Sequence, residues 1–134
     1  MSLYVIDANV VAKWFLPEPY SDKARGLLDT YNRGVHDLSA PDLLIPEVTN
    51  VFWKRAERGD ITALEANANL SDLLALGIPL VSSSQLAAKA LTLAHAHKRS
   101  VYDCLYLALA LDRGCDLISS DDRLYNSIGT IFPQ

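Results

Sequence analysis

Short apolar segments alternate with longer amphipathic segments along the chain. The first apolar segment, Leu3 to Ile6, is continuous and rich in β-branched residues, and it stops at Asp7. This pattern is typical of a strand buried on both faces of a parallel sheet. Further short apolar runs, which predict more strands, lie within Asp37 to Leu44, at Ile78 to Val81 and at Asp116 to Ser120. A last short apolar run is at Thr130 to Phe132.

The amphipathic segments between these runs predict helices with ordinary start and stop residues. Pro46, followed by Glu47, opens one helix, and Gly59 ends it. Glycine also ends other predicted helices, as at Gly114. The predicted helices begin at about Val10, Ser21, Pro46, Ala63, Gln85 and Ser100, and a helical turn is expected in 121–126.

The order of these elements predicts the fold class. Strands alternate with helices, and no Asn-Gly or Asp-Gly hairpin turn occurs between them, which indicates parallel pairing through helical crossovers. We therefore expect an α/β fold, a three-layer α/β/α sandwich with a short central parallel sheet. In such sheets ligands bind beyond the carboxyl ends of the strands, near the point where the strand order reverses.

Composition and charge limit the number of domains and the class of protein. The chain has 134 residues, 50% hydrophobic and 21% charged, which suits a single domain over residues 1–134. No apolar run reaches the roughly 18 residues of a membrane span, and the start does not resemble a secretory signal, so we expect a cytoplasmic protein without a membrane partner. Cys104 and Cys115 have neither disulfide-framework nor zinc-site spacing. The net charge of −4 argues against a broad basic surface for nucleic acid.

Four acidic residues, Asp7, Glu47, Asp103 and Asp121, each stand at a predicted helix start. Taken singly, each is explained by the positive end of a helix dipole, which favours an acid by about 0.3–1 kcal/mol. Ser100 three residues before Asp103 also resembles a capping box.

Taken together, the four acids suggest a shared site. Asp7 and Asp121 both follow apolar strand runs, whose carboxyl ends lie at one edge of a parallel sheet. If the backbone stays extended there, Asn9 lies on the same side as Asp7, and Ser119 on the same side as Asp121. Asp122 then points away, and whether it contributes to the site stays open.

The helix that begins near Glu47 adds a polar stripe. Asn50 and Lys54 follow Glu47 at i+3 and i+7, on one helical face. Arg55 is interpreted as a solvated surface charge.

The chemistry of clustered carboxylates favours a hard cation. Oxygen ligands without His or Cys select Mg²⁺ or Mn²⁺, and one or two such ions would neutralise the repulsion between the acids. A metal-activated water is a nucleophile suited to phosphodiester hydrolysis.

Four fragments carry a resemblance to a known family. In chain order they are Val5-Ile6-Asp7-Ala8-Asn9, Pro46-Glu47-Val48-Thr49-Asn50, Tyr102-Asp103-Cys104-Leu105-Tyr106-Leu107-Ala108 and Leu117-Ile118-Ser119-Ser120-Asp121-Asp122-Arg123-Leu124. The chain resembles PIN-domain ribonucleases of the VapC toxin type. The resemblance covers essentially the full length.

The resemblance implies a metal-dependent endoribonuclease, the toxin of a toxin–antitoxin pair. It further implies a homodimer and a cognate antitoxin protein as partners, with RNA as substrate. The implied catalytic and metal-binding residues are Asp7, Glu47, Asp103 and Asp121, supported by Asn9, Asn50 and Ser119. Lys54 and Arg123 lie near these acids in the sequence and are candidate contacts to substrate phosphates.

Two alternatives belong to other functional classes. The same fold could serve as a non-catalytic binding module in which the acids only cap helices. It could also be a phosphoryl-transfer protein that uses Asp7, although Asp7-Ala8-Asn9 lacks the second acid of a DxD arrangement and no P-loop is present.

Overall fold

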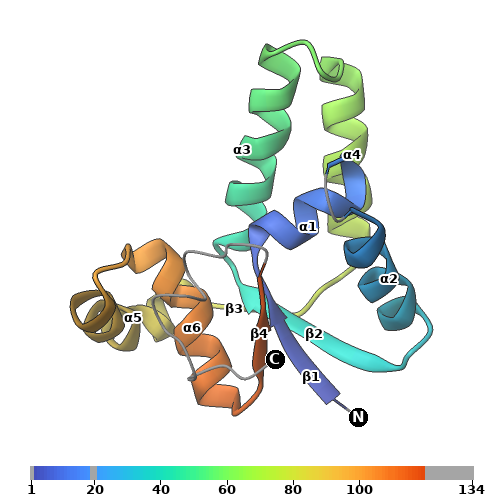
Figure 1. The fold of residues 1–134 in the computed structure, drawn as a ribbon. Coiled ribbons are helices and arrows are strands. Elements are labelled where there is room, and N and C mark those ends of the chain that lie inside the picture. Colours follow the sequence, from blue (N-terminus) through green and yellow to red (C-terminus); the bar gives the residue numbers. More distant parts are fainter. Residues whose placement is uncertain (1, 19–20, 120–134) are drawn as a thin grey trace.

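A four-stranded parallel sheet forms the centre of the protein in the computed structural model, which describes residues 2–18 and 21–119 (Figure 1). The strands are β1 (Ser2–Ile6), β2 (His36–Pro41), β3 (Leu80–Val81) and β4 (Asp116–Ile118), in the spatial order β3-β2-β1-β4. Every pairing is parallel. The α/β class and the parallel sheet predicted from the sequence are confirmed.

Helices cover both faces of this sheet. They are α1 (Ala8–Phe15), α2 (Ser21–Asn32), α3 (Leu44–Glu57), α4 (Ala63–Ala75), α5 (Ser83–His97) and α6 (Val101–Arg113). Helix α6 contacts β1, β2 and β4 and packs on α5, whereas α2 contacts β2 and packs on α1. Figure 1 shows α5 and α6 on one side of the sheet and α1 and α2 on the other. The layers are those of an α/β/α sandwich.

Helix α6 is the central helix of the core. Seven consecutive residues, Cys104 to Ala110, are buried. A helix that is buried on all sides needs a nearly continuous apolar sequence, and the Leu- and Ala-rich run of α6 provides it. Because α6 lies between the sheet and α5, its first turn is fixed at the edge where the parallel strands end.

Helices α3 and α4 pack side by side and extend beyond the sheet (Figure 1). Helix α1 anchors this pair, since the ring of Phe15 meets the ring of Phe52 edge to face at 5.6 Å between centroids. On its other side α1 is tied to α2, because the indole N–H of Trp14 donates to the carbonyl of Ala24 at 2.7 Å. Helix α1 therefore joins the α3–α4 pair to α2.

Two helices begin two residues earlier than the sequence pattern predicted. Helix α1 starts at Ala8 because Asp7 itself is the N-cap and accepts a hydrogen bond from the backbone N–H of Val10. Helix α3 starts at Leu44, which places Pro46 at its third position. The backbone N–H groups in the first turn of a helix have no acceptor within the helix, so a proline, which lacks this N–H, is tolerated there.

Helix α5 also begins two residues early, at Ser83, for a different reason. The carboxylate of Asp42, just after β2, accepts hydrogen bonds from the backbone N–H of Ser83 at 3.1 Å and from its hydroxyl at 2.5 Å. This cap comes from a residue 41 positions away, so a local pattern could not reveal it.

The strand order reverses beside β1. The chain adds β2 and β3 on one side of β1 and then returns to place β4 on the other side. The edge where β1 and β4 end is therefore the position at which α/β sheets bind ligands. No helix in the described part of the chain is long and apolar enough to cross a membrane.

Candidate active site

Asp7 stands where β1 ends, at the reversal of strand order. Its side chain is 6% exposed. One carboxylate oxygen, Oδ1, accepts from the N–H of Val10 at 3.0 Å, and the other, Oδ2, accepts from the hydroxyl of Ser119. The backbone N–H of Asp7 donates to the carbonyl of Ile118 at 3.4 Å. Asp7 and Ser119, at the ends of neighbouring strands, thus lie in direct contact.

Glu47 approaches this edge from the first turn of α3. Its half-buried carboxylate accepts a hydrogen bond from the hydroxyl of Tyr106 at 2.5 Å. Burial raises the pKa of Glu47 and the charge of Asp103 raises it further, while the hydrogen bond from Tyr106 opposes both. Glu47 therefore lies within electrostatic range of Asp103, although 56 positions separate them in the chain.

Asp103 lies in the first turn of α6. Its backbone N–H donates to the hydroxyl of the N-cap residue Ser100 at 3.1 Å, so half of the expected capping box is present. The carboxylate of Asp103 instead accepts from the guanidinium of Arg99 at 2.8 Å. In α4 both halves of a capping box form, between Thr62 and Glu65. The Asp103 carboxylate is therefore not explained by helix capping alone.

The hydroxyl of Tyr106 contacts one of the three described acids and lies within electrostatic range of the other two. Burial and the hydrogen bond to Glu47 raise the pKa of Tyr106 far above its ordinary value, and the charges of Glu47, Asp7 and Asp103 raise it further. The charges of three carboxylates thus act on one hydroxyl; they come from the end of β1, from α3 and from α6.

The donor chemistry of this neighbourhood suits a hard divalent cation, since it offers carboxylate and hydroxyl oxygens. Within residues 2–18 and 21–119, however, no three His, Cys, Asp or Glu side chains are close enough together to form a metal site by themselves. Mg²⁺ commonly takes only one or two carboxylates and keeps several waters. A pair of these acids with waters, or with a further acid, fits such an ion.

The other predicted site residues have different surroundings. Asn50 and Lys54 are exposed on α3, on the helical face expected from their spacing. Asn9 is exposed in the first turn of α1, so the argument from extended backbone was wrong for this residue: the helix begins directly after Asp7. Asp121, Asp122 and Arg123, and the helical turn and last apolar run expected after residue 120, lie outside the described residues.

Two residues near the acids were missing from the sequence prediction of the site. Tyr106 follows Asp103 at i+3 on α6, a spacing that places both on one helical face. Tyr106 could have been predicted as a site residue from this spacing. Arg99 precedes Asp103 by four positions, in the segment before α6. Its contact with Asp103 could not be predicted from the sequence, because the contact depends on the path of the turn between α5 and α6.

Arg55, interpreted above as a solvated surface charge, belongs instead to an ion-pair network. Its guanidinium contacts the carboxylate of Glu18 at 2.5 Å and that of Asp60 at 3.7 Å, and its side chain is only 18% exposed. Lys13 approaches Glu18 at 3.8 Å. Arg55 therefore joins α3 to the segment after α1.

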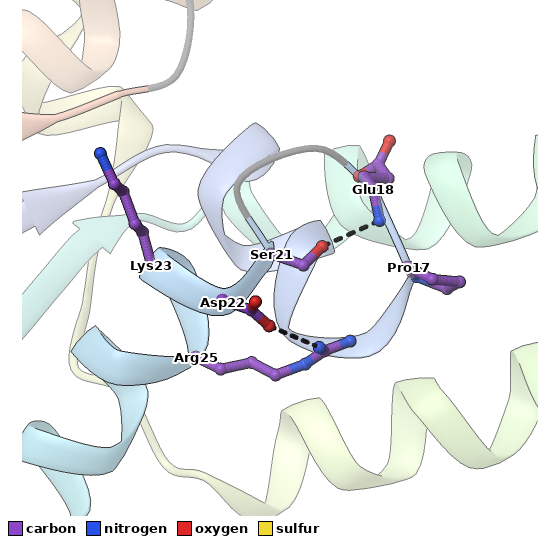
Figure 2. A pocket seen from close by; sticks show the side chains of 6 residues that line it. All are labelled: Pro17, Glu18, Ser21, Asp22, Lys23 and Arg25. Carbon is purple, nitrogen blue, oxygen red and sulfur yellow. Dashed lines mark hydrogen bonds and ion pairs between the residues drawn. The ribbon is translucent and has the colours of Figure 1, made fainter.

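A hollow lies beside this segment, at the start of α2 (Figure 2). Figure 2 shows the Ser21 hydroxyl turned toward Glu18, whose backbone N–H donates to it at 2.9 Å, and Arg25 turned toward Asp22, 3.8 Å away. Both of these contacts join residues three positions apart in the chain. None of the residues predicted for the acidic site is among the described residues that line this hollow.

Comparisons with known proteins agree with this fold. The PIN domain family model matches residues 4–127. The chain is 32% identical over 122 residues to Ribonuclease VapC3 of Pyrobaculum aerophilum, and the match covers 90% of each protein. The structure also resembles the crystal structure of PAE2754 from Pyrobaculum aerophilum, with a TM-score of 0.73 and 21% identity, over 94% of this chain and 79% of that one.

The chain belongs to the PIN domain family. The resemblance to VapC-type PIN-domain proteins, which the four sequence fragments indicated, is confirmed by the match to Ribonuclease VapC3. The structural likeness supports the same fold.

Proposed function

We propose that this protein is a divalent-metal-dependent endoribonuclease and the toxin component of a toxin–antitoxin pair. The observation that carries the proposal is that Asp7 stands at the ligand-binding edge of a PIN-domain sheet, while the hydroxyl of Tyr106 contacts Glu47 and lies within electrostatic range of Asp7 and Asp103. Similarity to a protein named Ribonuclease VapC3 supports RNA as the substrate class.

The proposed cofactor is Mg²⁺ or Mn²⁺, as one or two ions held by Asp7, Glu47, Asp103 and Asp121. When bound, such an ion supplies a water of lowered pKa and offsets the negative charge of the phosphate. The protein contributes orientation: Val10 and Ser119 fix the carboxylate of Asp7, and Tyr106 fixes that of Glu47. Arg99 contacts the carboxylate of Asp103 and balances part of its charge. Asp121 completes the set in this proposal.

The substrate would approach along the exposed polar stripe of α3. Asn50 is one helical turn beyond Glu47, and Lys54 is one turn further. Because the protein carries a net charge of −4, single cations such as Lys54 and Arg123 matter more for binding phosphates than on a basic protein. We propose Asn9 and Asn50 as supporting amides. The expected products carry 5′-phosphate and 3′-hydroxyl ends.

The proposed partners follow from the VapC-type relative. We propose a cognate antitoxin protein that inhibits the enzyme, a homodimer as the assembled form, and the cytoplasm as the compartment of action. A binding assay between this chain and the product of a neighbouring short reading frame tests the first of these.

RNA cleavage by the purified protein tests the proposed activity. The substrate is end-labelled single-stranded RNA, with Mn²⁺, with Mg²⁺ or with EDTA. We expect cleavage only with metal, and a loss on the order of 100-fold or more in Asp7→Asn and Asp103→Asn, because even residues that merely orient metal ligands contribute about 10–100-fold. Asp112→Asn is the matched control, since Asp112 lies at the other end of α6 and pairs with Lys89 at 2.5 Å. Undiminished cleavage in the two site variants would refute the assignment and favour a non-catalytic binding module.

A further inference from the structure

Tyr106 makes a contact to the acidic site that its position in the core does not require. Its ring is only 3% exposed and packs with the buried residues of α6. A phenylalanine would fill the same space. The hydroxyl, however, reaches out of the core to α3 and donates to Oε1 of Glu47 at 2.5 Å.

This contact restricts a side chain that is otherwise flexible. A half-buried glutamate has several rotatable bonds and samples many rotamers, and a ligand that binds it must select one of them. One hydrogen bond from a hydroxyl on a buried, rigid ring fixes the position of Oε1. Among the described residues, Oε2 of Glu47 has no hydrogen-bond partner, so this oxygen is available to a cation.

We propose that Tyr106 is a positioning residue of the metal site: its hydroxyl holds one oxygen of the Glu47 carboxylate in place, so that the second oxygen can bind a divalent cation. The inference rests on the proposed function, since it assigns a role to Tyr106 within the same site. In this proposal Tyr106 acts through Glu47 and does not itself bind the metal or the substrate.

The test is Tyr106→Phe in the full-length chain, which removes one oxygen and keeps the ring. Mn²⁺ is titrated while two quantities are measured: the rise of the melting temperature and the rate of RNA cleavage. We expect the half-maximal Mn²⁺ concentration to rise about 10–100-fold in both measurements. At saturating Mn²⁺ the cleavage rate should return to within a few-fold of the wild-type rate, because the ligands themselves are intact.

Tyr102→Phe is the matched control. Tyr102 is one turn earlier on α6 and is 63% exposed, so its hydroxyl is removed without touching Glu47. Its Mn²⁺ dependence should equal that of the wild type. Glu47→Asp is a second variant that does not disturb the core; its shorter side chain withdraws the carboxylate from the Tyr106 hydroxyl, and it should raise the half-maximal Mn²⁺ concentration as Tyr106→Phe does.

A double variant separates positioning from core packing. If Tyr106 acts through Glu47, Tyr106→Phe should change Mn²⁺ binding little when Glu47→Gln is already present. A wild-type protein that neither melts higher with Mn²⁺ nor cleaves RNA would overturn the proposed function. A wild type that does both, with Tyr106→Phe showing the same Mn²⁺ dependence, would overturn the positioning role alone.

Discussion

The hydroxyl of Ser119 donates a hydrogen bond to the carboxylate of Asp7, although 112 positions separate the two residues in the chain. The contact exists because β4 pairs with β1 in the register Ile6 to Ile118, so that Asp7 and Ser119 follow directly where the two strands end. This pair marks the reversal of strand order. It links the last described strand to the first acid of the candidate site.

Ser119→Ala tests whether this hydroxyl orients Asp7. We expect weaker Mn²⁺ binding by about 10-fold or more, because the carboxylate loses a fixed partner. The free energy of unfolding without metal should fall by about 1 kcal/mol for the lost hydrogen bond. Titration calorimetry with Mn²⁺ and chemical denaturation measure the two effects. Ser84→Ala, at an exposed position of α5, is the control; equal Mn²⁺ affinity in both variants would argue against an orienting role.

Asp7→Asn distinguishes a metal ligand from a helix cap. Asparagine caps as well as aspartate, and its amide oxygen can still accept from Val10, so the metal-free protein should be as stable as the wild type or more stable. Mn²⁺ should no longer raise its melting temperature as it does for the wild type. Asp7→Ala removes the cap and should cost about 0.5–2 kcal/mol. Thermal melts with and without Mn²⁺ distinguish the two roles. If Mn²⁺ raises the melting temperature of Asp7→Asn as much as that of the wild type, Asp7 is a helix cap and not a metal ligand.

Arg99→Gln tests how the charge of the acidic site is balanced. Arg99 contacts the carboxylate of Asp103 at 2.8 Å and is therefore a positive charge beside one of the acids. Its removal leaves more negative charge, so Mn²⁺ should bind about three- to tenfold more tightly. The metal-free protein should lose about 1 kcal/mol or less, since the Asp103 carboxylate is partly exposed. Arg99→Lys keeps the charge and should bind Mn²⁺ as the wild type does. Weaker Mn²⁺ binding in Arg99→Gln would mean that Arg99 supports the site instead of competing with the ion.

Arg55→Gln should affect stability and leave cleavage per folded molecule unchanged. The variant breaks the contact to Glu18, in which both side chains are less than a quarter exposed, and we expect a loss of about 1–3 kcal/mol. Arg58→Gln is the control, since its side chain is 69% exposed and its contact to Asp60 at 3.4 Å should contribute little. Urea unfolding compares the two variants. A fall in cleavage rate at full folding would instead assign Arg55 to substrate binding.

The general position of the site could be predicted because it depends on periodic features. Continuous apolar runs without hairpin turns indicate a parallel sheet, and a parallel sheet brings the ends of its strands to one edge. The contact between Asp7 and Ser119 is a direct consequence of this rule. Glu47 could be predicted in the first turn of α3 from Pro46 before it, even though the helix begins earlier.

The contacts between elements could not be predicted in the same way. The hydrogen bond from Tyr106 to Glu47 depends on how α6 and α3 lie relative to each other, which no local spacing encodes. The cap of α5 by Asp42 is another contact of this kind. The prediction for Asn9 was wrong for a local reason. It assumed that the extended backbone continues past Asp7, but helix α1 begins directly after Asp7.

Anomalous diffraction from crystals of the full chain soaked in Mn²⁺ tests the shared acidic site most directly. The account predicts a manganese peak at the carboxyl edge of the sheet, within about 2.0–2.5 Å of carboxylate oxygens from at least two of the four proposed ligands, Asp7, Glu47, Asp103 and Asp121. The peak should disappear in Asp103→Asn or Asp7→Asn crystals grown in the same way. A peak elsewhere on the molecule, or none at a Mn²⁺ concentration that supports RNA cleavage, would contradict it.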